Sequence, residues 1–223
     1  MGIGHLAVAF AAKRAVPRAP LALLLFAATL PDVLWGTLVL SGVERARIVP
    51  GITAASALDL YHYPYSHSLA ACVVWAALAA AAVFLFARDR ALALLVAACV
   101  LSHWVLDVIS HRRDVPVGLH GPYLGLGLWN SVSASIAVEE SMLAIGLMLY
   151  VRATVAKSPA ATWGLAALAL LFAGLGVAGY LAPPPPAIAP VAASNLAGVL
   201  FVLAAHAIDR RRAPALPAPA AHP

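Results

Sequence analysis

Residues 91–110 read ALALLVAACVLSHWVLDVIS, an apolar run up to Leu101 that gains polar residues towards its end. A helix of this length spans about 30 Å, the thickness of a bilayer's hydrocarbon core. His103, Asp107 and His111 recur every four residues, so one helix face carries all three. Within lipid an ionisable side chain costs about 2.5–3.5 kcal/mol or more unless it is paired, faces a cavity or binds a metal. We therefore expect function on that face.

The composition extends this conclusion to the whole chain. Of 223 residues, 63% are hydrophobic and 10% are charged, whereas soluble proteins carry about 25% charged residues. Residues 2–12 form a shorter apolar stretch of about 17 Å, too short to cross. We predict an all-α, polytopic transmembrane bundle with a short N-terminal helix, one domain over 1–212 and a disordered Ala/Pro-rich tail over 213–223. The six predicted full spans are 20–41, 68–87, 91–110, 130–151, 162–182 and 191–208.

The net charge is +5, and the basic residues that produce it lie at the ends of the predicted helices. Alternating crossings place ten of the 14 basic residues, including Lys13 and Arg14, on one side, and four on the other. The positive-inside rule assigns the richer side to the cytoplasm, together with the C-terminus. The charge thus indicates topology, and we expect the lipid bilayer, not nucleic acid, as the partner. The sequence leaves the oligomeric state open.

Ionisable residues of four predicted segments then meet at one depth, beneath the outer face. Imidazoles with carboxylates favour zinc, manganese or iron over magnesium. A metal activates water for attack on an ester, with a spare carboxylate as the general base. A site at this depth suits a lipid or lipid-linked substrate. The converging residues are Asp32, His62, His67, His103, Asp107, His111, Glu139 and Glu140.

Each of these residues also has a structural interpretation. His103 alone is typical of a hydrogen-bonded packing histidine, but Asp107 one turn away favours a functional pair. His111 precedes two arginines and also fits a solvated helix end. Asp32 follows Pro31 and could satisfy the backbone groups that a proline frees. Ser66 and Ser68 flank His67 and could cap a helix.

In the fourth span, the side chains of Glu139 and Glu140 point about 100° apart on a helix. Only one of them can easily face a given pocket. Glu139 shares a face with Ser135 and is therefore favoured over Glu140. Asp59 is expected to pair with Arg45 or Arg47 across the outer connection.

Four short motifs occur in a specific order: Gly4-His5, Leu30-Pro31-Asp32, His62…His67-Ser68 and Ser102-His103…Asp107. Over roughly residues 3–140 the chain resembles the bacterial inner-membrane proteins described as membrane-bound metal-dependent hydrolases. The segment Gly125–Ser131 followed by Glu139 is similar to a subgroup of them. Where that family often has Pro-Asp-x-Asp-His, this chain has Pro31-Asp32-Val33-Leu34-Trp35 and lacks the second carboxylate.

The resemblance implies metal-dependent hydrolysis in the bacterial inner membrane, and it adds His5 to the site if the N-terminal helix enters from the periplasmic side. The leading hypothesis is a hydrolase of a lipid-like phosphoester or ester at the outer face, using a divalent metal, with zinc favoured and manganese or iron as alternatives. Glu139 and Asp32 are the expected catalytic residues. The expected metal ligands are His67, His103, Asp107, His5, His62 and His111.

Two other classes remain open from the sequence. A small transporter or permease would use the same residues as a proton relay and would also need acidic groups in the inner half, which is nearly free of them. A non-catalytic membrane scaffold would tolerate the combined substitutions His103→Ala and Asp107→Asn.

Overall fold

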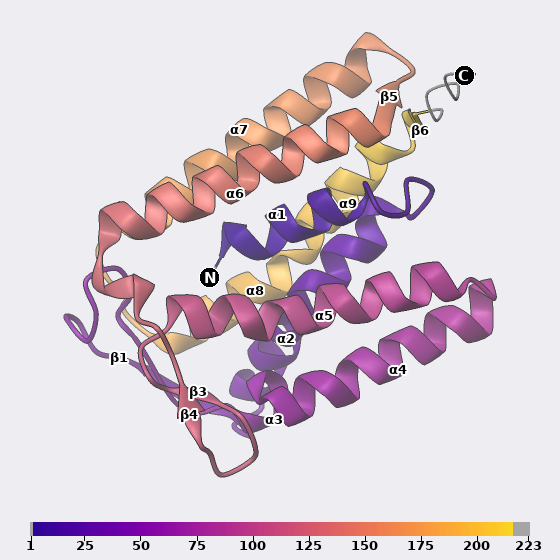
Figure 1. Ribbon diagram of the computed structural model, residues 1–223. Coiled ribbons are helices and arrows are strands. Elements are labelled where there is room, and N and C mark those ends of the chain that lie inside the picture. The colour runs from indigo at the N-terminus through magenta and orange to yellow at the C-terminus, as the bar shows by residue number, and fades with distance from the viewer. Residues whose placement is uncertain (1, 216–223) are drawn as a thin grey trace, which may run out of the picture.

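The computed structural model describes residues 2–215, and helices dominate this part of the chain (Figure 1). Helix α1 (Ile3–Ala12) is short, and within the described residues six helical segments are long and apolar enough to cross a membrane. This confirms the predicted all-α class with six spans and a short N-terminal helix. The crossing segments are α2 (Leu21–Leu40), α4 (Leu69–Ala87), α5 (Arg90–Ser110), α6 (Val132–Ala153), α7 (Pro159–Leu181) and the pair α8 (Ile188–Ala197) and α9 (Val199–Asp209).

Local capping explains where several of these helices begin. The side chains of Ser68, Asp89 and Ser131 accept hydrogen bonds from the amides three residues ahead and thereby cap α4, α5 and α6. Ser66, which the sequence offered as another cap, donates its hydroxyl to Glu44 instead.

Short two-stranded ribbons join the helices. Strands β1 (Arg45–Ile48) and β2 (Leu58–His62), followed by the short helix α3 (Pro64–His67), occupy the connection before α4. Strands β3 (Val115–Pro116) and β4 (Tyr123–Leu124) and the 3-10 turn η1 (Leu128–Asn130) follow α5. Both ribbons lie at the end of the bundle near the N-terminus (Figure 1).

A third ribbon pairs β5 (Thr154–Ala156) with β6 (Arg212–Pro214) at the opposite end. Strand β6 includes the first residues of the segment that the sequence assigns to a tail. Residues 216–223 of that predicted tail lie outside the described part of the chain.

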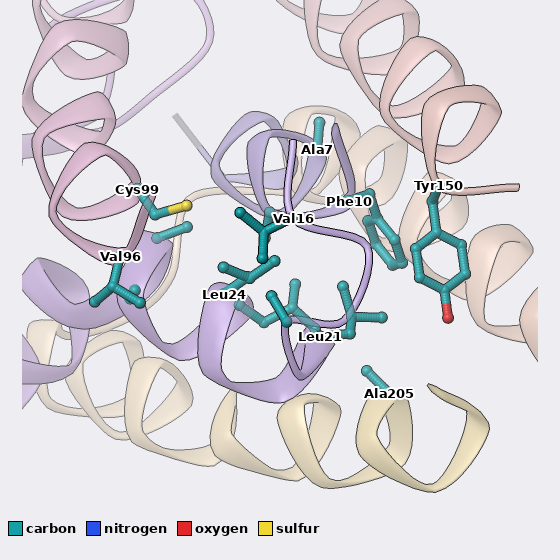
Figure 2. Close-up of a cluster of buried hydrophobic side chains, with 14 of the residues drawn as sticks. Ala7, Phe10, Val16, Leu21, Leu24, Val96, Cys99, Tyr150 and Ala205 are labelled. Atoms are coloured by element: carbon teal, nitrogen blue, oxygen red, sulfur yellow. The ribbon is translucent and has the colours of Figure 1, made fainter. Parts of the chain in front are cut away.

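Helix α1 is packed inside the bundle, against α6 on one side and α2 on the other (Figure 1). Phe10 lies beside Tyr150 (Figure 2) and makes an edge-to-face contact with it, at a ring-centroid distance of 5.5 Å. A second edge-to-face contact joins Phe10 to Phe172, at 6.3 Å. Gly146 of α6 allows the closest approach, because a Cβ atom there would lie 2.4 Å from the carbonyl oxygen of Ala7. An apolar core therefore holds this short helix at a fixed position.

An ion-pair cluster anchors α1 at its C-terminal end. Lys13 Nζ lies 2.6 Å from a carboxylate oxygen of Asp209, which also accepts the hydroxyl of Tyr150 and the amide of Leu21. The first turn of α2 and the last turn of α9 therefore meet here. His5, at the other end of α1, faces the opposite end of the bundle.

Candidate metal centre

The centre of the site is His103, whose side chain is fully buried on α5. Its Nδ1 lies 2.8 Å from the carbonyl oxygen of Ala28 in α2. A carbonyl only accepts hydrogen bonds, so Nδ1 carries the ring proton and the Nε2 of a neutral ring bears a lone pair. The lone pair of Nε2 is directed into the cluster described next.

Two acceptor groups lie close to Nε2 of His103. Nε2 of His103 lies 3.2 Å from Nε2 of His67 and 3.2 Å from Oδ2 of Asp107. The same carboxylate oxygen lies 3.6 Å from Nε2 of His67. Buried electron pairs that face one another at these distances repel unless a cation or a proton lies between them.

Asp32 of α2 completes the group from the more open side. Its Oδ1 lies 3.7 Å from Nε2 of His67 and 3.8 Å from Nε2 of His103. Its side chain is 30% exposed, against 2% for Asp107. Asp32 is therefore the carboxylate of this cluster with access to a substrate or to water.

The separations suit a small tetrahedral cation. Four ligand atoms 2.0–2.1 Å from a zinc ion lie about 3.3 Å from one another. The separations among the ligand atoms of His67, His103 and Asp107 run from 3.2 to 3.6 Å, and Oδ1 of Asp32 lies 3.7 and 3.8 Å from the two histidine nitrogens. Two overlapping groups could hold a metal, one formed by His5, His103 and Asp107 and the other by Asp32, His67 and His103.

His5 reaches the cluster from α1. Its ring stacks on His103 with centroids 3.6 Å apart and planes within 6°. Its Nε2 lies 3.2 Å from Oδ1 of Asp107, yet among the residues that the structure describes neither ring nitrogen of His5 makes a hydrogen bond of acceptable geometry. A buried imidazole with no such partner is a further fit to a metal ligand.

The cluster opens into a cavity of about 170 Å³. Asp32, His67, Asp107 and His111 contribute its ionisable surface. Aromatic and aliphatic side chains supply most of the remaining wall, so a hydrocarbon-bearing molecule would find an apolar lining. These other lining residues are Gly2, Trp35, Leu58, Leu60, Tyr63, Trp129, Val191 and Asn195.

His111 forms part of the wall without belonging to either metal-binding group. Its ring stacks on Trp129 at a centroid distance of 4.1 Å, and its Nδ1 lies 3.2 Å from Oδ1 of Asp114. Burial lowers the pKa of His111, and the carboxylates of Asp107 and Asp114 oppose that shift. Its Nε2 lies 3.5 Å from Oδ1 of Asp107, within reach of the cluster.

Glu139 does not lie with these residues. Its carboxylate accepts hydrogen bonds from the amides of Gly2 (3.2 Å) and Gly4 (3.0 Å) and from the hydroxyl of Tyr180 in α7. It thus binds the N-terminal amides of α1, where a negative charge is favourable. Glu140 turns towards α7, with its carboxylate against Gly176.

His62 also lies apart from the cluster. It lies opposite Arg45 in the backbone register of the β1–β2 ribbon, and its side chain is exposed. The ribbon turns this end of β2 towards solvent, whereas α3 directs His67 inwards. Asp59 pairs with Arg47, as the sequence predicts, and also with Arg112.

Glu44 is the residue that sequence reasoning missed. It is buried, and its oxygens accept the amides of Tyr65 and Ser66 and the hydroxyl of Ser66. The hydroxyl of Ser66 lies 2.7 Å from Nδ1 of His67. The sequence carries little signal for this role, because an acid next to Arg45 and three residues before Arg47 is typical of a solvated loop.

Comparison with known proteins bears on the whole site. A family model described as YdjM inner membrane protein matches residues 1–184. The chain belongs to this family. As a YdjM family member with six apolar crossing segments, it is a multi-pass inner-membrane protein. The YdjM match includes every residue of the cluster and ends before α8.

No curated protein and no solved structure matches the chain. The YdjM description names a membrane location and no reaction.

Proposed function

We propose that the chain is a membrane-embedded hydrolase that depends on one divalent metal ion, with zinc favoured and manganese or iron as alternatives. His67, His103, Asp107 and His5 would hold the ion. The observation that carries the proposal is the position of the buried Nε2 of His103, 3.2 Å from both an imidazole nitrogen and a carboxylate oxygen. Burial of these groups without a cation would be unfavourable.

A zinc ion in such a site lowers the pKa of water and polarises an ester or phosphoryl oxygen. The protein's own contribution is to place a base beside the reacting atoms. Asp32 suits that role, because it lines the cavity and is the more exposed carboxylate. Its carboxylate would accept the proton of the attacking water as the ester bond breaks.

We assign Glu139 a positioning role and not that of the base expected from the sequence. Its oxygens are engaged by three donors, two of which are the first amides of α1. It would therefore act by holding His5 against His103. His62 has no role in this proposal.

The proposed substrate is a lipid-like phosphoester or ester. Trp35, Leu60 and Trp129 give the cavity apolar walls next to ionisable groups, which fits an amphiphile with its head at the cluster. The excess of basic residues at the far end supports a cytoplasmic location for that end and a periplasmic location for the cavity.

Elemental analysis of the detergent-purified protein tests the metal. We expect close to one zinc, manganese or iron per chain in the wild type and a large loss in His103→Ala. His206→Ala is the matched control, since His206 is exposed on α9 in the opposite half of the bundle. A folded wild type that contains and binds none of these metals would end the proposal.

The reaction is tested in vesicles that contain phosphatidic acid and phosphatidylglycerol. We expect release of phosphate or a soluble phosphoester that stops on chelation, returns with zinc and is lost in Asp32→Asn. Solute flux that survives chelation would favour the transporter alternative. Normal function of a His103→Ala and Asp107→Asn double variant in cells would favour the scaffold.

A further inference from the structure

Glu44 is a buried acid that the proposed reaction does not use. It lies between α2 and β1, outside the crossing helices, and its side chain is 1% exposed. Oε1 accepts the amides of Tyr65 and Ser66 at 2.7 and 2.9 Å. One oxygen is thus committed to the backbone of α3, the helix that ends at His67.

The second oxygen begins a chain of hydrogen bonds to the metal cluster. Oε2 of Glu44 lies 2.5 Å from Oγ of Ser66, which lies 2.7 Å from Nδ1 of His67. A carboxylate only accepts, so the single hydroxyl proton of Ser66 is donated to Glu44. Oγ can then serve His67 only as an acceptor, and the ring proton of His67 must be on Nδ1.

We propose that Glu44, acting through Ser66, is the positioning residue that fixes the tautomer of His67 and presents its Nε2 lone pair to the metal. The role in metal binding rests on the proposed function, but the tautomer is a property of the metal-free protein. Outer partners of this kind orient imidazole ligands and raise their basicity in many metal sites. The tautomer of His103 is fixed separately, by the carbonyl of Ala28.

In this arrangement the Nε2 atoms of His67 and His103 repel each other, and a cation between them would relieve that repulsion. With both ring protons on Nδ1, the Nε2 atoms of His67 and His103 face each other at 3.2 Å as two lone pairs. Without Glu44 the proton of His67 could move to Nε2 and be donated to the lone pair on Nε2 of His103, 3.2 Å away. Glu44 thereby prevents His67 from forming a hydrogen bond within the metal-free cluster through its Nε2.

Glu44→Gln tests this with almost no change in shape. The amide oxygen keeps the backbone contacts, while the amide nitrogen donates to Ser66 Oγ where the carboxylate accepted. The hydroxyl of Ser66 then donates to Nδ1 of His67, and the ring proton moves to Nε2. We expect the ring ¹⁵N shifts of His67 in the metal-free protein to change from the Nδ1–H to the Nε2–H pattern. Zinc affinity should fall about 10- to 100-fold.

Asp59→Asn is the matched control, because Asp59 is another buried acid in the connection between α2 and α3 and contacts Arg47 and Arg112. It should leave the His67 signals and zinc affinity unchanged. Ser66→Ala is the second variant, in case Glu44→Gln fails to fold. Removing the hydroxyl should give His67 a mixture of tautomers and lower zinc affinity about 10-fold.

The outcomes separate this inference from the proposed function. An Nε2–H tautomer in the metal-free wild type overturns the inference, and so does an unchanged tautomer with unchanged zinc affinity in both variants. A wild type that shows the Nδ1–H tautomer, shifted by Glu44→Gln, but binds no metal supports the hydrogen-bond chain and removes the metal-dependent function.

Discussion

Substitution of Gly146 by alanine should disturb the site from a distance, through the seating of α1 on α6. The added Cβ would lie 2.4 Å from the carbonyl oxygen of Ala7, and real Cβ atoms essentially never approach another atom closer than 3.0 Å. Helix α1 must therefore move by at least about 0.6 Å. His5 lies two residues from Ala7 on the same helix. Functional groups need to be held within about 0.5 Å, so the shift is large enough to matter.

Gly146→Ala has two effects of opposite sign on the free energy of unfolding. Overpacking costs about 1–3 kcal/mol, and the upper half of that range applies because the atom met is backbone. Alanine in place of glycine within a helix returns about 1 kcal/mol. We therefore expect a net loss of about 1–2 kcal/mol in the free energy of unfolding. The displaced ligand should lower zinc affinity about 10- to 100-fold.

Thermal unfolding and zinc titration of the detergent-purified protein measure the two effects. Gly174→Ala on α7 is the control, since its Cβ would meet no atom within 4 Å. It should raise stability slightly and leave zinc affinity alone. If Gly146→Ala matches Gly174→Ala in both measurements, α1 is not seated as described and His5 has no fixed place in the cluster.

Three further outcomes follow from other contacts. Lys13→Ala should lower the free energy of unfolding by about 3 kcal/mol, because it leaves the carboxylate of Asp209, only 11% exposed, without its cation. Arg18→Ala should lower the free energy of unfolding by at most about 1 kcal/mol, since 67% of the Arg18 side chain is exposed. Chemical denaturation compares the two variants. Glu139→Ala should lower the free energy of unfolding by about 1 kcal/mol, because α1 loses its cap, and it should also weaken zinc binding. Glu140→Ala is the control. Equal zinc affinities in the two variants would contradict the positioning role of Glu139. A protease-cleavable tag before the first residue should be cut from the periplasmic side of intact spheroplasts, and cleavage only after lysis would reverse the orientation proposed for α1.

The sequence by itself determined the class of protein and the depth of its polar groups. Long apolar runs predict crossing helices because the backbone must satisfy its own hydrogen bonds in lipid. Alternating crossings then place Asp32, His67 and the end of α5 at one end of the bundle. The four-residue spacing of His103 and Asp107 fixes them on one face, and the structure keeps them together.

Only the tertiary structure decided which of these residues meet. Helices in lipid are apolar nearly all round, so periodicity shows which side chains share a face but not towards which neighbour that face turns. Packing of α1 between α2 and α6 brings His5 onto His103, and it draws Glu139 to the amides of Gly2 and Gly4. Likewise, His62 and His67 stand five residues apart, yet the end of a ribbon and the turn of α3 send them in different directions. The partners that separate them, such as Glu44, are distant along the chain, and no local pattern encodes contacts of that kind.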